Sequence, residues 1–111
     1  MPSVEEDPVK VATLGDLPPG TAMLVDVGGR PICLARTEDG EVFAVDDTCT
    51  HEEESLSEGW LDGACIECPA HNSIFDLRTG EPISLPAEEP VATPAVTVDG
   101  QDILISVHDQ I

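Results

Sequence analysis

Two short segments of this 111-residue chain each place a cysteine close to a histidine. The first is Cys49-Thr50-His51 and the second is Cys68-Pro69-Ala70-His71. Each segment offers one thiolate and one imidazole, so together they can supply two sulfur and two nitrogen ligands to metal. A structural zinc site usually takes its cysteines from one knuckle and its histidines from another. Because the two residue types alternate here, the pattern favours a binuclear centre in which one metal ion takes both cysteines and the other takes both histidines.

This arrangement resembles the Rieske [2Fe–2S] motif, in which two histidines replace two cysteines on one of the irons. Two thiolates balance the charge of a core with two ferric irons, so the oxidised site is neutral and becomes singly negative on reduction. An added electron costs less free energy there than in an all-cysteine site. Rieske centres accordingly lie at roughly −150 to +300 mV, against about −400 mV for plant-type ferredoxins.

Further segments extend the resemblance to the soluble Rieske ferredoxins of bacterial aromatic ring-hydroxylating dioxygenase systems. In chain order these segments are Cys49–His51, Ser55–Gly59, Cys68–His71 and Phe75–Gly80, within about residues 40–90. The resemblance implies that Cys49, His51, Cys68 and His71 bind one [2Fe–2S] cluster, with both cysteines on the inner iron. It also implies an electron carrier between a flavoprotein ferredoxin reductase and a terminal oxygenase, without catalysis of its own.

Departures from the high-potential Rieske proteins of cytochrome bc-type complexes predict a lower reduction potential. Those proteins join the two ligand loops by a disulfide, but the corresponding positions here are Glu54 and Ala70. Phe75 occupies the position of a tyrosine whose hydroxyl lies near a cysteine ligand, whereas the serine of the second loop is retained as Ser73. Fewer hydrogen bonds to sulfur and more nearby carboxylates both favour the oxidised form. We expect a potential in the lower part of the Rieske range.

Two alternatives to an electron carrier remain compatible with these residues. One is a zinc-stabilised β-sheet binding module, because the ligand types also suit zinc. The other is a Rieske-like small subunit of a nitrite reductase-type enzyme.

Four other residues with chemical potential have ordinary interpretations. Cys33 and Cys65 lie in apolar, strand-like segments and are predicted to be small buried residues. Trp60 is predicted to pack beneath the first ligand loop, and Arg78 to serve a turn.

The elements that must hold the two loops are predicted to be β-strands. Helical periodicity is weak, and short runs rich in β-branched residues recur between glycine, proline and Asp signals. Two-residue spacing at Gly28-Gly29, and the turns Glu38–Gly40 and Asp99–Asp102, predict hairpins. One helical turn is expected at Leu14–Leu17. The predicted strands are Val9–Leu14, Thr21–Val27, Arg30–Thr37, Glu41–Asp46, Ala64–Glu67, Ser73–Asp76, Ala95–Val98 and Ile103–Val107.

The chain length fits one domain over residues 1–111. The prediction is an all-β Rieske fold of three antiparallel sheets. A cluster-binding subdomain at about 47–86 would be inserted into a basal sandwich or barrel formed by about 9–46 and 87–107, whose flanking strands pair with each other.

The composition restricts the possible partners. Four Lys/Arg against 23 Asp/Glu give a formal charge of −19, which disfavours nucleic acid and anionic membranes. Acidic groups such as Glu52–Glu54 are either a solubilising surface or a guide for a basic partner. The N-terminal residues show no signal-peptide pattern, and no apolar run approaches the ~20 residues of a membrane span. We therefore expect a cytoplasmic location with reduced cysteines. A monomer is expected as well, although the sequence alone does not distinguish a free ferredoxin from a detachable subunit.

Overall fold

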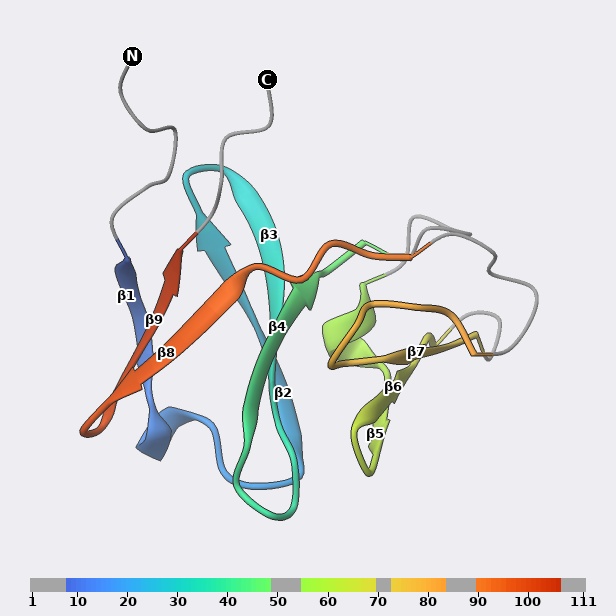
Figure 1. The fold of residues 1–111 in the computed structure, drawn as a ribbon, viewed down its shortest axis with the longest axis horizontal. Helices are drawn as coiled ribbons and strands as arrows, with labels where there is room; N and C mark the ends of the chain where they lie inside the picture. The colour runs from blue at the N-terminus through green and yellow to red at the C-terminus, as the bar shows by residue number, and fades with distance from the viewer. Residues whose placement is uncertain (1–7, 49–54, 70–72, 84–89, 107–111) are drawn as a thin grey trace.

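The computed structural model describes residues 8–48, 55–69, 73–83 and 90–106. Within these ranges the chain forms β-strands and two short 3₁₀ helices, η1 (Leu14–Asp16) and η2 (Leu56–Glu58). Three antiparallel sheets result, in the strand orders β1-β9-β8, β2-β3-β4 and β5-β6-β7 (Figure 1). The strands are β1 (Val9–Thr13), β2 (Thr21–Val27), β3 (Arg30–Arg36), β4 (Val42–Asp46), β5 (Trp60–Asp62), β6 (Cys65–Glu67), β7 (Ile74–Asp76), β8 (Ala95–Asp99) and β9 (Asp102–Ser106). The predicted all-β fold of three antiparallel sheets is confirmed.

The predicted turns join neighbouring strands at the expected places. Gly28 and Gly29 have φ angles of 62° and 88° between the paired residues Val27 and Arg30. Positive φ at both turn positions is the geometry that two-residue hairpins require, and glycine adopts it without a steric penalty. The expected helical turn is present as η1. The first strand β1 pairs with the last strand β9, so the two ends of the described chain share a sheet as predicted.

The sheet β2-β3-β4 is the middle layer of the molecule. Ile32 and Leu34 of β3 lie in one buried cluster with Ile103 and Ile105 of β9. Cys33 and Ala35, which alternate with them, lie in a second cluster with residues of the small sheet. Successive side chains of a strand point to opposite faces, so β3 is buried on both sides. This double burial explains its continuous apolar sequence.

The small sheet β5-β6-β7 lies beside the two larger sheets, at the right of the view in Figure 1. Its inner face contributes Ile66 and Phe75, both 0% exposed, to the cluster shared with the middle sheet. β5 was not among the predicted strands. Trp60-Leu61-Asp62 contains no β-branched residue, and pairing with β6 makes it a strand. No helix in the described ranges is long and apolar enough to cross a membrane.

Candidate metal centre

The base of the first ligand loop is fixed by Asp47. This residue is only 4% exposed, and its carboxylate accepts a hydrogen bond from the Ser57 backbone N–H at 2.9 Å and another from the Ser55 hydroxyl. The Asp47 carbonyl accepts from the Leu56 N–H at 2.7 Å. Thr48 forms an antiparallel bridge with Ser55. The residues directly before and directly after the segment 49–54 are therefore held next to each other.

The base of the second ligand loop is closed in the same way. The Cys68 N–H donates to the Ser73 carbonyl at 2.7 Å, and both residues are 0% exposed. Cys68 directly follows β6, and Ser73 directly precedes β7. Because these strands are neighbours in the small sheet, the segment between them is held at both ends by the β6–β7 ladder.

Direct packing brings the two loop bases together. Leu56 follows the first loop and lies in the same buried cluster as Cys68 and Phe75. η2 is followed by its C-cap Gly59, where a Cβ atom would lie 1.8 Å from the Glu67 carbonyl oxygen and 3.2 Å from Pro69 Cδ. Only glycine permits this approach of one backbone segment to another. Gly59 thus allows the segment after the first loop to pack closely against the residues at the start of the second loop.

Of the four predicted ligands, Cys68 lies in the described structure, fully buried and not in a disulfide. Cys49, His51 and His71 lie outside the described residues, as do the positions Glu54 and Ala70 that replace a disulfide. Sequence reasoning named Ser57 and Gly59 only within the segment Ser55–Gly59 of the resemblance, and it assigned no role to them or to Asp47. The signal was present as an acid two residues before Cys49 and hydroxyl residues directly after the loop, a pattern typical of side-chain capping of a loop.

The other two described cysteines differ from each other. Cys33 is fully buried, and burial together with the negative charge of Asp47 raises the pKa of its thiol to about 12. Cys65 is only partly buried, so that part of its prediction is wrong. Burial, followed by the charges of Asp76 and Asp62, raises the pKa of its thiol as well. Neither thiol is disposed to ionise at neutral pH, so neither resembles a reactive nucleophile.

Two further predictions concern residues near the small sheet. The prediction that Trp60 packs beneath the first loop is wrong, because its side chain is 56% exposed. Trp60 stands opposite Glu67 in the β5–β6 pair, on the face that turns away from the core. Arg78 serves a turn as predicted: its N–H donates to the Asp76 carboxylate at 2.8 Å, and the Gly80 N–H donates to the Asp76 carbonyl at 2.7 Å.

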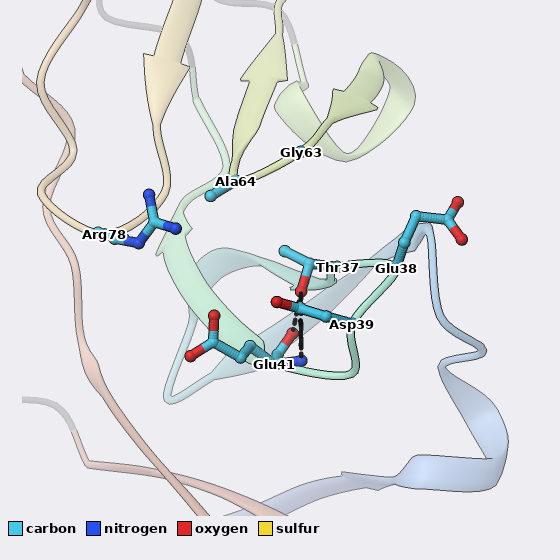
Figure 2. Close-up of a pocket in the computed structure, with 7 residues that line it drawn as sticks. All are labelled: Thr37, Glu38, Asp39, Glu41, Gly63, Ala64 and Arg78. Carbon is cyan, nitrogen blue, oxygen red and sulfur yellow. Dashed lines mark hydrogen bonds between the residues drawn. The ribbon is translucent and has the colours of Figure 1, made fainter.

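A surface pocket of about 270 Å³ lies between the β3–β4 turn and the β5–β6 turn (Figure 2). Its walls include Arg78, Ala64 and Glu41, and Figure 2 shows the Glu38 carboxylate directed away from the guanidinium of Arg78. A hydrogen bond from Thr37 lowers the pKa of the Asp39 carboxyl group in the same turn. The β5–β6 turn is at the opposite end of the hairpin from Glu67 and the second loop. The pocket is therefore separate from the candidate metal centre.

The chemistry of the donor set fits an iron–sulfur cluster. The described donor, Cys68, provides a thiol in an apolar setting at a loop fixed by backbone hydrogen bonds. Thiolate ligands select iron–sulfur clusters and zinc, whereas a hydrophobic shell restricts solvent access and tunes the potential. The buried cluster around Cys68 supplies such a shell on the protein side.

Comparisons with known proteins agree with this interpretation. The family model of the Rieske [2Fe-2S] domain matches residues 7–106. The 3-phenylpropionate/cinnamic acid dioxygenase ferredoxin subunit of Photorhabdus laumondii is 44% identical over 101 residues, which cover 90% of this chain and 94% of the relative. The family match and the similarity to this relative favour a ferredoxin over the two alternatives, a zinc-stabilised binding module and a nitrite reductase-type small subunit.

Solved structures give the same result. The ferredoxin of carbazole 1,9a-dioxygenase from Nocardioides aromaticivorans IC177 has a TM-score of 0.85 and 41% identity, covering 90% of this chain and 97% of that one. A chain in the complex of reduced oxygenase and oxidised ferredoxin in carbazole 1,9a-dioxygenase is also similar. It has a TM-score of 0.84 and 36% identity, and the match covers 99% of this chain and 99% of that one. The chain therefore belongs to the Rieske [2Fe–2S] family, as an electron-carrying ferredoxin of the kind found in aromatic dioxygenase systems, with one cluster implied per chain.

Proposed function

We propose that this ferredoxin carries single electrons from a flavoprotein reductase to a terminal ring-hydroxylating oxygenase, and that it does so as a cytoplasmic monomer. The observation that carries the proposal is the position of Cys68. Its buried thiol lies at the closed base of the second loop, and Gly59 holds that base against the exit of the first loop. The similarity to a ferredoxin that forms a complex with its oxygenase supports the choice of partner.

The proposed ligands are Cys49, His51, Cys68 and His71, with both cysteines on the inner iron and with about residues 47–86 as the cluster-binding subdomain. When bound, the cluster supplies a one-electron centre. The role of the chain is to hold the ligands rigidly and to keep water from the cysteine side. Buried Phe75, which shares the apolar cluster of Cys68, adds no hydroxyl donor on that side. This setting supports a potential in the lower part of the Rieske range.

The ligand assignment is tested by single substitutions to alanine. Cys49→Ala, His51→Ala, Cys68→Ala and His71→Ala should each abolish the visible absorption and the low-average-g EPR signal of the reduced protein. Iron and labile sulfide should fall in parallel. Cys65→Ala is the matched control, because Cys65 begins β6, the strand that Cys68 directly follows, and points away from the core. A full chromophore in any of the four ligand variants would contradict the assignment.

The electron-transfer role is tested by reconstitution. The purified holoprotein, a flavoprotein ferredoxin reductase, NADH and a terminal oxygenase should together sustain turnover that stops when the ferredoxin is omitted. Voltammetry should give a midpoint in the lower part of the Rieske range, and a value well above zero at neutral pH would contradict the low-potential assignment. Sedimentation at micromolar concentration should give the mass of one chain.

A further inference from the structure

The outer face of the small sheet carries an apolar row that the core does not use. Trp60 pairs with Glu67, and Glu67 pairs with Ile74. Ile83 continues the row, because its N–H donates to the Ile74 carbonyl at 2.7 Å and the adjacent Pro82 bridges Phe75. Directly paired residues of neighbouring strands project to the same side of a sheet. The alternate row, which includes Ile66 and Phe75, projects inward and is buried.

This row leaves large apolar side chains exposed to solvent that the core does not bury. Trp60 and Ile83 are each 56% exposed, and they stand at the two ends of the row with the partly buried Ile74 between them. A single exposed apolar residue is ordinary, whereas a group on one sheet face beside a functional site is typical of a binding surface. Tryptophan is also one of the residue types enriched among the residues that carry most of the binding energy of protein interfaces.

The row lies at the end of the sheet that carries the second ligand loop. Glu67 directly precedes Cys68, and Ile74 directly follows Ser73, the two residues whose hydrogen bond closes the loop. A protein that covers the row must therefore approach the candidate metal centre closely. Close approach is what electron transfer between proteins requires, whereas a merely structural contact has no reason to be at this end.

The other end of the same face is acidic. Asp62, Cys65 and Asp76 form the next outward row across β5, β6 and β7. Glu67 adds a further carboxylate between the apolar residues, and none of these outward positions carries a basic residue. The matching surface is accordingly an apolar patch bordered by lysine or arginine. A second copy of this chain is a poor match, since each copy has a formal charge of −19.

We propose that this outer face, defined by Trp60, Glu67, Ile74 and Ile83, is the docking surface for the terminal oxygenase. The commitment to the oxygenase rests on the proposed function and on the similarity to a ferredoxin seen in complex with its oxygenase. Trp60 and Ile83 supply the buried apolar contact, and the acidic row sets the orientation through complementary charge.

The experiment compares holoproteins altered on this face with a control altered on another sheet. Trp60→Ser and Ile83→Ser remove the apolar contact, and Leu24→Ser is the matched control because Leu24 is 54% exposed on β2 of another sheet. All variants are first shown to have wild-type iron content, EPR signal and midpoint potential. The probes are the terminal oxygenases of the 3-phenylpropionate/cinnamic acid and carbazole dioxygenase systems, with the reductase in excess.

Trp60→Ser should raise the ferredoxin KM in oxygenase turnover about tenfold, as expected for the loss of one large apolar interface residue, and should leave reduction by the reductase unchanged. Leu24→Ser should change neither. Equal KM values for Trp60→Ser, Ile83→Ser and wild type would overturn the proposal. So would an effect confined to reduction by the reductase, or a wild-type dimer that Trp60→Ser converts to a monomer.

Because the chain has a single tryptophan, binding can also be observed without a mutation. Holoprotein labelled with 5-fluorotryptophan should give one fluorine resonance, which should shift or broaden when oxygenase is added and not when serum albumin is added. An unchanged resonance in a mixture that sustains turnover would overturn the docking surface alone. Wild-type protein that sustains turnover with neither oxygenase would instead count against the proposed function.

Discussion

Cys33 shows how one buried thiol makes stability depend on pH. Burial raises the pKa of the folded thiol from 9.0 to about 12, so the unfolded chain releases this proton at a lower pH than the folded chain. The stabilising effect is complete below pH 9.0 and is lost as the pH rises towards 12. Each pH unit in that interval lowers the free energy of unfolding by about 1.4 kcal/mol.

We therefore expect Cys33→Ala to be less stable than wild type by about 1 kcal/mol at pH 7, and the difference to disappear near pH 10. Urea unfolding of the holoproteins at both pH values measures the change. Val45→Ala is the control, because Val45 pairs with Cys33 across β3 and β4 and has no titrating group. If the stability difference between Cys33→Ala and wild type is the same at both pH values, the pKa of this thiol is not raised in the folded protein.

Asp47 is the second residue whose individual chemistry matters. Replacing its carboxylate with alanine leaves the partly buried Ser57 N–H without its acceptor. We expect Asp47→Ala to lose about 1–3 kcal/mol of stability and to lose its visible colour faster on warming. Asp47→Asn keeps one oxygen acceptor and should lose less. Asp26→Ala, at an exposed turn where Asp26 accepts from the Gly29 N–H, should retain wild-type colour. Equal colour retention in all three variants would refute a role in holding the loop.

At the scale of elements, the small sheet and η2 form a clamp around the two loop bases. Gly59 is the point of contact, and its backbone is extended, so only the space available to a Cβ atom limits substitution. Gly63 is different, because it has a φ of 60° in the β5–β6 turn and open space around its Cβ position. The two glycines therefore separate the effect of a steric clash from that of local backbone strain.

Gly59→Ala should force η2 away from the Glu67 carbonyl, with a loss of about 1–3 kcal/mol and a reduced content of bound iron. Gly63→Ala should cost about 1 kcal/mol through its left-handed backbone and leave the iron content unchanged. Thermal denaturation and iron analysis of the two purified variants make the comparison. Full iron content in Gly59→Ala would show that the contact does not position the loops.

At the scale of the whole molecule, the net charge of −19 dominates long-range interactions. The few cations are largely used within the fold: Lys10 pairs with Asp102 at 3.3 Å and Arg30 pairs with Asp46 at 2.8 Å. Arg36 donates to the Leu17 carbonyl at 3.3 Å. Little positive charge is left to offset the acidic surface, so a basic protein should be attracted from a distance.

The rate of electron transfer to a basic acceptor such as cytochrome c should fall as ionic strength rises from 0.01 to 0.15 M, over which the screening length shortens from about 30 to about 8 Å. The rate with ferricyanide, an anion, should rise over the same interval. Stopped-flow measurement with both oxidants separates charge effects from a general effect of salt. Parallel salt dependences would show that the surface charge does not guide encounter.

The sequence by itself determined the family resemblance, the proposed ligand pattern and most of the strands. Alternating Cys and His in two short segments is a local chemical signal, and glycine turns such as Gly28-Gly29 specify hairpins within a few residues. Only the tertiary structure decided which residues support the loops and which face solvent. Asp47 and Gly59 act through partners ten and eight residues away, and β5 becomes a strand through pairing with β6. The exposure of Trp60 follows from the register of that pairing. So short a strand has no alternating pattern from which the inward face could be predicted in the sequence.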